Sequence, residues 1–260
     1  MKRLSLTTLL TPLLLLTGCG GGELDNLEFE RISVSREVAI DKSEGAPRCT
    51  VDLQMDFLGE QYGEVAKAIN SAVVNKVFYL ENLSMKEAAD SFANKYCRDY
   101  VKNYAPLYRE DKADKKKLAW YEYQYKVSTE VSQERKGVLT YFINLEYYEG
   151  GAHGISQQLS MNFNKATGRQ MALADIFVPG YEQRLNELLL EALQEKTGTK
   201  NLDELHEEGY LYSMNIFAPE NFVLGDDKLT FIYNPYELAD YSKGKIELAI
   251  DYDDLEDIMK

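Results

Sequence analysis

Histidine and cysteine are scarce in this chain of 260 residues, which contains two histidines and three cysteines. Cysteine pairs with two-residue spacing, which are typical of zinc ribbons and thiol redox enzymes, do not occur. The sequence also lacks the phosphate-binding glycine loop, the glycine motif for dinucleotides and the nucleophile elbow of many hydrolases. We therefore expect that the protein binds no metal and uses no cofactor.

The two histidines, His153 and His206, restrict the catalytic mechanisms that the sequence can support. A serine or cysteine triad needs a histidine beside its nucleophile and a carboxylate. His153 is the better candidate because a glycine-rich turn exposes it, although we favour a structural role in which it bonds nearby backbone or packs on Tyr147. His206 follows acidic residues, and we expect it on a solvated helix face. The sequence thus predicts no catalytic residue and no enzyme, with a hydrolase that uses His153 as the least favoured alternative.

A short apolar run near the amino terminus is not long enough to form a permanent membrane-spanning helix. This run, residues 9–16, follows the basic residues Lys2 and Arg3 and leads into the sequence Leu-Thr-Gly-Cys. A basic region, a hydrophobic region and a cleavage site in this order are typical of a lipoprotein signal peptide. We predict that residues 1–18 form the signal peptide and that Cys19 carries the lipid. A buried amino-terminal helix with an incidental cysteine is the alternative.

Lipidation of Cys19 would anchor the protein to a bacterial membrane. Residues 19–26, which include three glycines, would then form a short flexible tether. Gly20 follows the cysteine where an aspartate would favour retention in the inner membrane, so we expect sorting to the outer membrane. The predicted location is the bacterial cell envelope, with the chain facing the periplasm or the cell surface.

Negative charge dominates the chain, whose formal net charge is −14. Such a surface repels the phosphates of nucleic acids and anionic lipid headgroups, and it attracts basic partners. We therefore expect no nucleic acid partner and contact with the membrane only through the lipid anchor. The alternative is that the protein is acidic without a basic partner, as many soluble exported proteins are.

The two remaining cysteines, Cys49 and Cys97, are both expected to point into the core. Cys49 begins an alternating apolar strand pattern, and Cys97 lies on the apolar face of a predicted helix. In an oxidising envelope they could form a disulfide that joins helix to sheet, or they could remain two buried thiols.

The clearest structural signal is a pair of alternating apolar patterns within residues 138–164. Every second residue is apolar in each half, as expected for half-buried strands. Gly150, Gly151 and Gly154 lie between the two halves and permit the backbone angles of a tight reversal. The segment is therefore predicted to form a long antiparallel hairpin.

Two helices are predicted before this hairpin. Apolar residues at helical spacing indicate the first over residues 61–80, and Ser84 with Glu87 forms a capping box that begins the second. We expect Pro106 to end the second helix near Tyr104. With the strands and the helix expected on either side, the sequence predicts an α+β fold, in which an antiparallel sheet carries helices mainly on one face.

Several short motifs in the second half of the chain resemble a known family. They are the turn Tyr-Tyr-Glu-Gly-Gly-Ala-His-Gly at residues 147–154, the segments at 163–168 and 173–177, and the segment that begins Phe-Ile-Tyr-Asn-Pro-Tyr-Glu at 231–237. These motifs resemble the RsiV-like domain, also called domain of unknown function 3298. Residues 49–125 are similar to the companion 4163-like half that often precedes it.

The resemblance implies an architecture and a cellular setting. It suggests two fused halves, residues 27–115 and 116–260, divided at the charged loop 111–117. In its family the domain forms the extracytoplasmic part of an anti-sigma factor that senses lysozyme, and it accompanies the catalytic domain of some peptidoglycan deacetylases. The present sequence has neither the transmembrane helix nor the sigma-factor-binding segment of the sensor, which argues against signalling by proteolysis across the membrane.

Tyrosine is abundant, with 19 residues, and exposed tyrosines can stack on sugars or anchor a protein partner. Most are expected in the core, but two predicted loops carry exposed candidates. The predicted partner-binding residues are Tyr148, Gly150, Gly151, His153, Pro235, Tyr236 and Tyr241. We interpret the chain as a lipid-anchored envelope binding protein without catalytic activity, which captures a basic lysozyme-like protein. The alternatives are a module that binds peptidoglycan fragments and a cell-wall hydrolase that uses His153.

Overall fold

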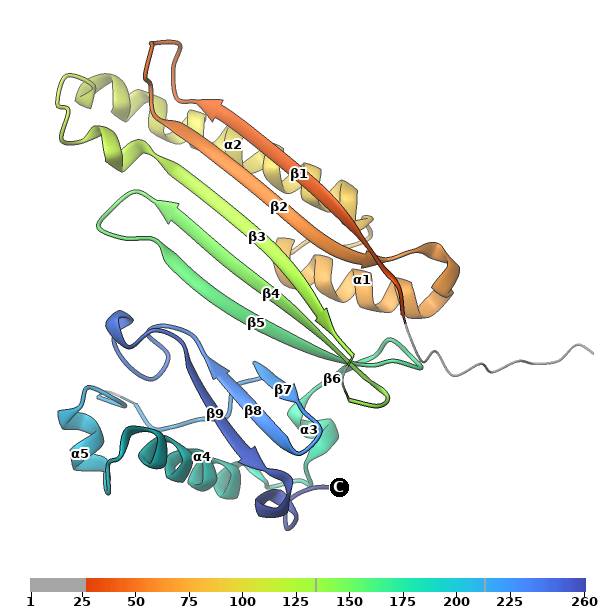
Figure 1. Ribbon diagram of the computed structural model, residues 1–260. Helices are drawn as coiled ribbons and strands as arrows, with labels where there is room; N and C mark the ends of the chain where they lie inside the picture. The colour runs from red at the N-terminus through yellow and green to blue at the C-terminus, as the bar shows by residue number, and fades with distance from the viewer. Residues whose placement is uncertain (1–26, 134, 213) are drawn as a thin grey trace, which may run out of the picture.

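The computed structural model describes residues 27–133, 135–212 and 214–260, and these residues form two β-sheets with associated helices (Figure 1). The signal peptide, Cys19 and the tether fall outside the described residues. The expected α+β class is confirmed. Among the described residues, none of the helices combines the length and the apolar character needed to cross a bilayer.

The large sheet contains six strands in the order of the chain. They are β1 (Phe29–Ala39), β2 (Arg48–Leu58), β3 (Tyr123–Ser132), β4 (Val138–Glu149), β5 (Ile155–Asn164) and β6 (Gln170–Met171). Neighbouring strands are antiparallel except β2 and β3, which are parallel. A parallel pair requires a crossover connection, and helices α1 (Gly63–Phe78) and α2 (Met85–Asp111) provide it.

Helix α2 begins at the predicted capping box but ends later than predicted. The Ser84 hydroxyl accepts a hydrogen bond from the Glu87 N–H, and the Glu87 carboxylate accepts one from the Ser84 N–H at 2.9 Å. The helix continues through Pro106 to Asp111, so the expected end near Tyr104 is wrong. Buried Tyr108, which packs edge-on against Tyr121 at 5.5 Å, stabilises the turn that follows the proline.

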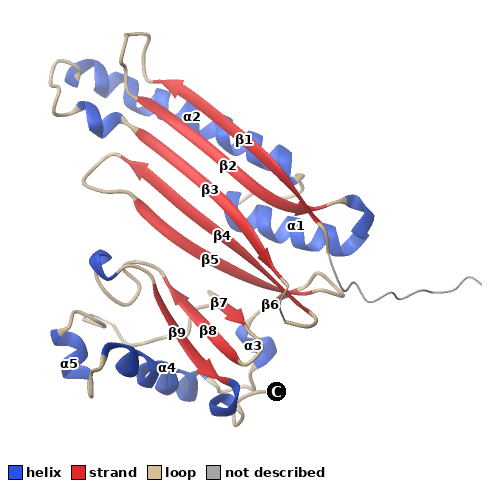
Figure 2. Ribbon diagram, in the orientation of Figure 1, coloured by secondary structure: helices blue, strands red, loops and turns tan. Residues whose placement is uncertain are grey.

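Helices α1 and α2 cover one face of the large sheet (Figure 2). The alternate strand positions, which point to the opposite face, carry polar residues such as Asp52, Gln54, Lys126 and Ser128. The core between helices and sheet includes alternate residues of the central strands together with apolar helix residues. Its strand members include Cys49, Val51, Leu53, Met55, Val127, Leu139, Tyr141, Ile143, Met161 and Phe163. Apolar residues alternate along β4 and β5 because every second side chain packs under the helices, as the sequence predicted.

The predicted cysteine pair lies within this core. The Sγ atoms of Cys49 and Cys97 are 3.9 Å apart, and the two residues are free thiols in the structure. The prediction that both point inward agrees with their burial. The disulfide stays a prediction, because the two sulfurs are neighbours but are not bonded.

The small sheet contains β7 (Phe222–Leu224), β8 (Lys228–Tyr233) and β9 (Ile246–Asp251), all antiparallel. Helix α4 (Glu182–Thr197) packs on one face of this sheet, and α3 (Leu173–Ile176) and α5 (Leu202–Glu207) lie near it. Figure 1 shows α4 on the side away from the large sheet. The other face of the small sheet therefore points toward the large one.

Two asparagine side chains connect the sheets along β5. The Asn221 amide accepts hydrogen bonds from the backbone N–H and the hydroxyl of Ser160, and it donates to the carbonyl oxygens of Gln158 and Ile232. The side-chain Oδ1 of Asn234 accepts a hydrogen bond from the Gln158 N–H at 2.7 Å. The two side chains thus bond backbone groups of β5 in the way that a neighbouring strand would. They fix the position of the small sheet against the large one.

Two hydrophobic clusters divide the described chain. The first contains residues from Leu27 to Phe163, and the second contains Val138 and residues from Leu173 onward. Strands β3, β4 and β5 thus pack with the helices that precede them, although they follow the proposed division at residues 115 and 116. That boundary stays a prediction.

Candidate functional site

The turn between β4 and β5 brings His153 to the surface. Gly150 has a φ of +78°, and a Cβ atom there would lie 2.4 Å from the carbonyl oxygen of Trp120, so glycine is required. The Tyr148 hydroxyl donates a hydrogen bond to the carbonyl oxygen of Gly151 at 2.9 Å. Tyr148, Gly150 and Gly151 therefore shape the turn that carries His153.

A second turn, Asn234-Pro235-Tyr236-Glu237, presents Tyr236. The Glu237 N–H bonds to the Asn234 carbonyl oxygen at 3.1 Å, which closes the turn, and Pro235 occupies the position that proline favours. Tyr236 has a φ of +75°, in the left-handed region where glycine or asparagine is usual. Its side chain is nevertheless 56% exposed, so core packing does not account for tyrosine at this position. Strained non-glycine residues of this kind are concentrated at functional sites.

The two turns meet at three aromatic rings, His153, Tyr236 and Tyr241, which we call the aromatic cluster. The rings of His153 and Tyr241 stack with centroids 4.2 Å apart and an interplanar angle of 20°. The Tyr236 hydroxyl lies 3.4 Å from His153 Nε2, and its ring is 5.7 Å from that of Tyr241. Residues 83 positions apart in the chain therefore form one exposed surface.

Hydrogen bonding assigns the tautomer of His153. Its Nδ1 lies 2.9 Å from the carbonyl oxygen of Gly154, which can only accept, so Nδ1 carries the proton. Nε2 is then free to accept the hydroxyl proton of Tyr236. The hydrogen-bond partners of the ring are thus a backbone carbonyl and a tyrosine, with no serine, cysteine or carboxylate among them. The ring stacks on Tyr241 and not on the expected Tyr147, and the structural role of His153 stays a prediction.

The other predicted residues take supporting positions. Tyr148 also contacts the carbonyl oxygen of Ala119 at 3.3 Å and takes no part in the aromatic cluster. Pro235 fixes the second turn and His206 lies on α5, apart from the aromatic cluster. The structure therefore gathers His153, Tyr236 and Tyr241, while Tyr148, Gly150, Gly151 and Pro235 hold their loops.

A polar cleft of about 380 Å³ lies between the open face of the large sheet and the small sheet. We call it the inter-sheet cleft. It is lined by Glu130, Phe142, Gln158, Val223, Thr230, Ile232, Lys245 and Glu247. A neighbouring hollow of about 510 Å³ shares Glu130 and Phe142 with it and extends the cleft along β3.

Lys245 organises the polar groups of the inter-sheet cleft. Its ammonium group lies 2.7 Å from Gln158 Oε1 and 2.6 Å from Glu247 Oε1. Gln158 is also the residue whose backbone N–H donates to the side chain of Asn234, the first residue of the second turn. The cleft and the aromatic cluster are therefore built on the same part of β5.

Sequence reasoning missed the inter-sheet cleft. Its lining comes from six strands. In the sequence, the polar residues of β5 and β9 alternate with apolar ones, and this pattern fits a strand face exposed to solvent equally well. The described residues contain no group of three or more His, Cys, Asp or Glu side chains arranged to hold a metal ion.

Two family models match separate parts of the chain. Residues 174–253 match DUF3298, a protein family of unknown function, and residues 56–156 match a model described as deacetylase PdaC. The chain therefore carries a DUF3298 domain and a PdaC-like domain before it. The motif at residues 231–237 lies within the DUF3298 match, whereas the turn at 147–154, which we assigned to the same family, lies within the PdaC match. The likeness to RsiV and the lipoprotein assignment stay predictions.

Similar proteins agree with this domain composition. The chain is 26% identical over 211 residues to the peptidoglycan-N-acetylmuramic acid deacetylase PdaC of Bacillus subtilis. The match covers 77% of this chain and 43% of that protein. The chain thus spans less than half the length of that relative. A DUF3298 family member from Bacteroides fragilis has a similar crystal structure, with a TM-score of 0.82, 27% identity, and coverage of 90% of this chain and 94% of the other.

A second solved structure supports the fold alone. A DUF3298 family protein from Pseudomonas aeruginosa superposes with a TM-score of 0.63 at 16% identity, and the match covers 91% of this chain and 96% of that one.

The prediction that the chain has no catalytic activity is overturned by these matches. One family model is named for a deacetylase, and the curated relative is a peptidoglycan deacetylase. The prediction depended on scarce histidine and on missing motifs, which exclude particular mechanisms but do not exclude an enzyme whose catalytic groups follow another pattern.

Proposed function

We propose that this protein acts on the bacterial cell wall and binds the glycan chains of peptidoglycan at the aromatic cluster and the inter-sheet cleft. The observation that carries the proposal is the exposed, strained Tyr236 beside the stacked pair His153 and Tyr241, next to a polar cleft. The relation to a peptidoglycan deacetylase supports this substrate class.

The chemistry of the two features suits an amino sugar polymer. Tyrosine and histidine rings present flat apolar faces against which the C–H faces of sugar rings can pack, and their polar atoms remain available at the edge. In the cleft, Gln158, Lys245 and Glu247 supply donors and acceptors for hydroxyl and acetamido groups. Binding sites of this type combine apolar contact with a few placed polar groups.

Deacetylation is the reaction to test on the same substrate. It would break the amide bond of an acetamido group with one water molecule and release acetate and a sugar amine. We expect acetate release from purified peptidoglycan incubated with the protein, measured by an enzyme-coupled acetate assay. Glycan binding without acetate release would remove the catalytic part of the proposal and retain the recognition part.

Replacing Tyr236 tests recognition directly. We expect Tyr236→Gly to weaken binding of soluble peptidoglycan oligosaccharides about tenfold or more, equivalent to about 1.4 kcal/mol. The free energy of unfolding should change by less than about 1 kcal/mol, because relief of the backbone strain offsets the entropy cost of glycine. Calorimetric titration and urea unfolding measure the two effects.

Tyr79 provides a matched control for this variant. It is also an exposed tyrosine with positive φ, at 87% exposure and +54°, but it lies at the end of α1 outside both features. Tyr79→Gly should bind the oligosaccharides as the unmodified protein does. Unchanged affinity in Tyr236→Gly, or equal losses in both variants, would contradict the proposed site.

A basic protein such as lysozyme is a second candidate partner. The observation that favours it is the net charge of −14, which accelerates encounter with a basic protein. Such a complex should weaken markedly as salt rises from about 50 to 500 mM, whereas glycan binding through stacking and neutral hydrogen bonds should change little. Titration with lysozyme at the two salt concentrations separates the candidates.

We also propose that Cys19 is lipidated and holds the protein at the cell envelope, facing the periplasm or surface. The basic, apolar and small residues that lead to Cys19 support this. Cys19→Ala should move the protein from the detergent phase to the aqueous phase in detergent partitioning, with the Cys97→Ala variant as control. Retention of Cys19→Ala in the detergent phase would contradict lipid anchoring at this residue.

A further inference from the structure

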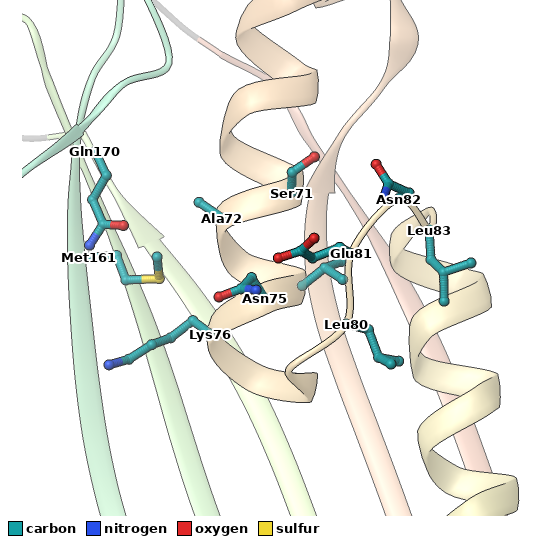
Figure 3. A pocket seen from close by; sticks show the side chains of 11 residues that line it. Ser71, Ala72, Asn75, Lys76, Leu80, Glu81, Asn82, Leu83, Met161 and Gln170 are labelled. Atoms are coloured by element: carbon teal, nitrogen blue, oxygen red, sulfur yellow. The ribbon is translucent and has the colours of Figure 1, made fainter.

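A separate pocket of about 440 Å³ lies on the helix-covered side of the large sheet (Figure 3). It is bounded by α1, by the loop between α1 and α2, and by Met161 and Gln170 from β5 and β6. Met161 belongs to the core beneath the helices, whereas Gln158 of the inter-sheet cleft lies on the opposite face of β5. The pocket, which we call the helix-side pocket, is therefore distinct from the candidate glycan site.

Polar side chains in the helix-side pocket are available for a ligand. They are Ser71, Asn75, Lys76, Glu81, Asn82 and Gln170. Within the described part of the chain, none of these side chains makes a hydrogen bond or an ion pair. Lys76 and Glu81 line the same pocket with opposite charges and still do not pair with each other. In Figure 3, Lys76 extends from α1 on the side of Met161, and Glu81 comes from the loop.

The loop that supplies Glu81 has an unusual backbone. Tyr79 and Asn82 have φ values of +54° and +57°, and they are two of the four described non-glycine residues with positive φ. One of the other two is Tyr236 in the aromatic cluster. The Tyr79 N–H bonds to the Asn75 carbonyl oxygen at 2.9 Å, which ends α1 and fixes the start of the loop. The loop thus adopts a conformation in which Glu81 and Asn82 line the pocket.

We propose that the helix-side pocket binds a short peptide with free termini. Lys76 would take the terminal carboxylate and Glu81 the terminal ammonium group, which explains opposite charges that line one pocket without pairing. The amides of Asn75, Asn82 and Gln170 can each donate to and accept from a peptide bond. Met161 and Leu80 provide an apolar contact for small side chains. The volume lies within the range of about 300–1,000 Å³ for small-ligand sites and is too small for a protein partner.

Capped and uncapped dipeptides test this assignment. We expect alanyl-alanine to bind the protein at least about tenfold more tightly than its N-acetyl derivative or its carboxyl-terminal amide. Amide resonances of residues 71–76 and 81–82 should shift on titration in two-dimensional NMR spectra. Equal affinity of the free and capped dipeptides, or no shift of these resonances at about 10 mM dipeptide, would overturn the proposal.

Two charge variants assign the ends of the ligand. Lys76→Met should abolish the preference for the free carboxylate and keep the preference for the free amine, and Glu81→Gln should do the reverse. Both side chains are exposed, so the fold should persist, and thermal unfolding checks this. Lys67→Met, on the same helix outside the pocket, should retain both preferences. A variant that loses both preferences or neither would contradict the assignment.

The peptide proposal does not depend on glycan binding. Tyr236→Gly should bind alanyl-alanine normally, and Lys76→Met should bind peptidoglycan oligosaccharides normally. Failure of the glycan proposal would leave the dipeptide result unaffected, whereas loss of dipeptide binding in Tyr236→Gly would contradict a separate pocket.

Discussion

Replacing Asn221 with alanine is expected to lower the free energy of unfolding by about 4 kcal/mol. The asparagine side chain makes four hydrogen bonds. Three are in β5, with the backbone N–H and the hydroxyl of Ser160 and the carbonyl oxygen of Gln158, and the fourth is with the carbonyl oxygen of Ile232. Each such bond contributes about 1 kcal/mol, and partners that stay buried without a replacement cost more. Urea unfolding followed by circular dichroism measures the change.

The same variant should loosen the candidate glycan site. Hydrogen exchange at the amide of Ser160 should accelerate by several orders of magnitude, because its acceptor is removed. Asn215→Ala is the matched control, since Asn215 is exposed in the segment that leads to β7 and its side chain makes no hydrogen bond in the described structure. A loss below about 1 kcal/mol in Asn221→Ala would show that the sheets are held together by other contacts.

Oxidation of Cys49 and Cys97 is expected to stabilise the protein by about 4 kcal/mol. The bond would close a loop of 48 residues and so reduce the entropy of the unfolded chain. Two thiols would lose two protons and two electrons to an oxidant such as diamide, which accepts both. Mass spectrometry would show the loss of two hydrogens, and urea unfolding of the oxidised and reduced forms would measure the gain.

Burial determines how these thiols react before oxidation. It raises the pKa of Cys49 and Cys97, so the reactive thiolate form is scarce near neutral pH. Iodoacetamide should therefore modify the folded reduced protein slowly and the urea-unfolded protein fast. Cys97→Ala should show no stabilisation by diamide. Equal stability of the oxidised and reduced protein would indicate that the closed bond strains the native core.

The spacing of apolar residues predicted the central hairpin of the large sheet and the first helix that covers it. Strands β4 and β5 occupy the two halves of the predicted hairpin, and α1 spans residues 63–78 within the expected 61–80. Both depend on periodicity, which is encoded in adjacent residues. Pro106 misled the prediction, because the contact of Tyr108 with Tyr121 that supports the helix beyond it is set by the tertiary structure.

The candidate site was predictable only in part. Its two loops stood out because each combines turn residues with exposed aromatics, and the structure brings His153 against Tyr236 and Tyr241. The inter-sheet cleft was not predictable, because it arises where side chains from two sheets face each other. The contact that sets their spacing, Asn221 with β5, appears in the sequence as an ordinary asparagine.

The asparagine bonds along β5 also limit the pairing of this strand with a second copy of the chain. An outer strand with unpaired backbone groups can add a strand from another molecule and so begin aggregation. The side chains of Asn221 and Asn234 bond the backbone groups of Gln158 and Ser160 that point away from β4. A strand from a second copy therefore cannot pair with this part of β5. This protection comes from the same side chains that position the candidate site.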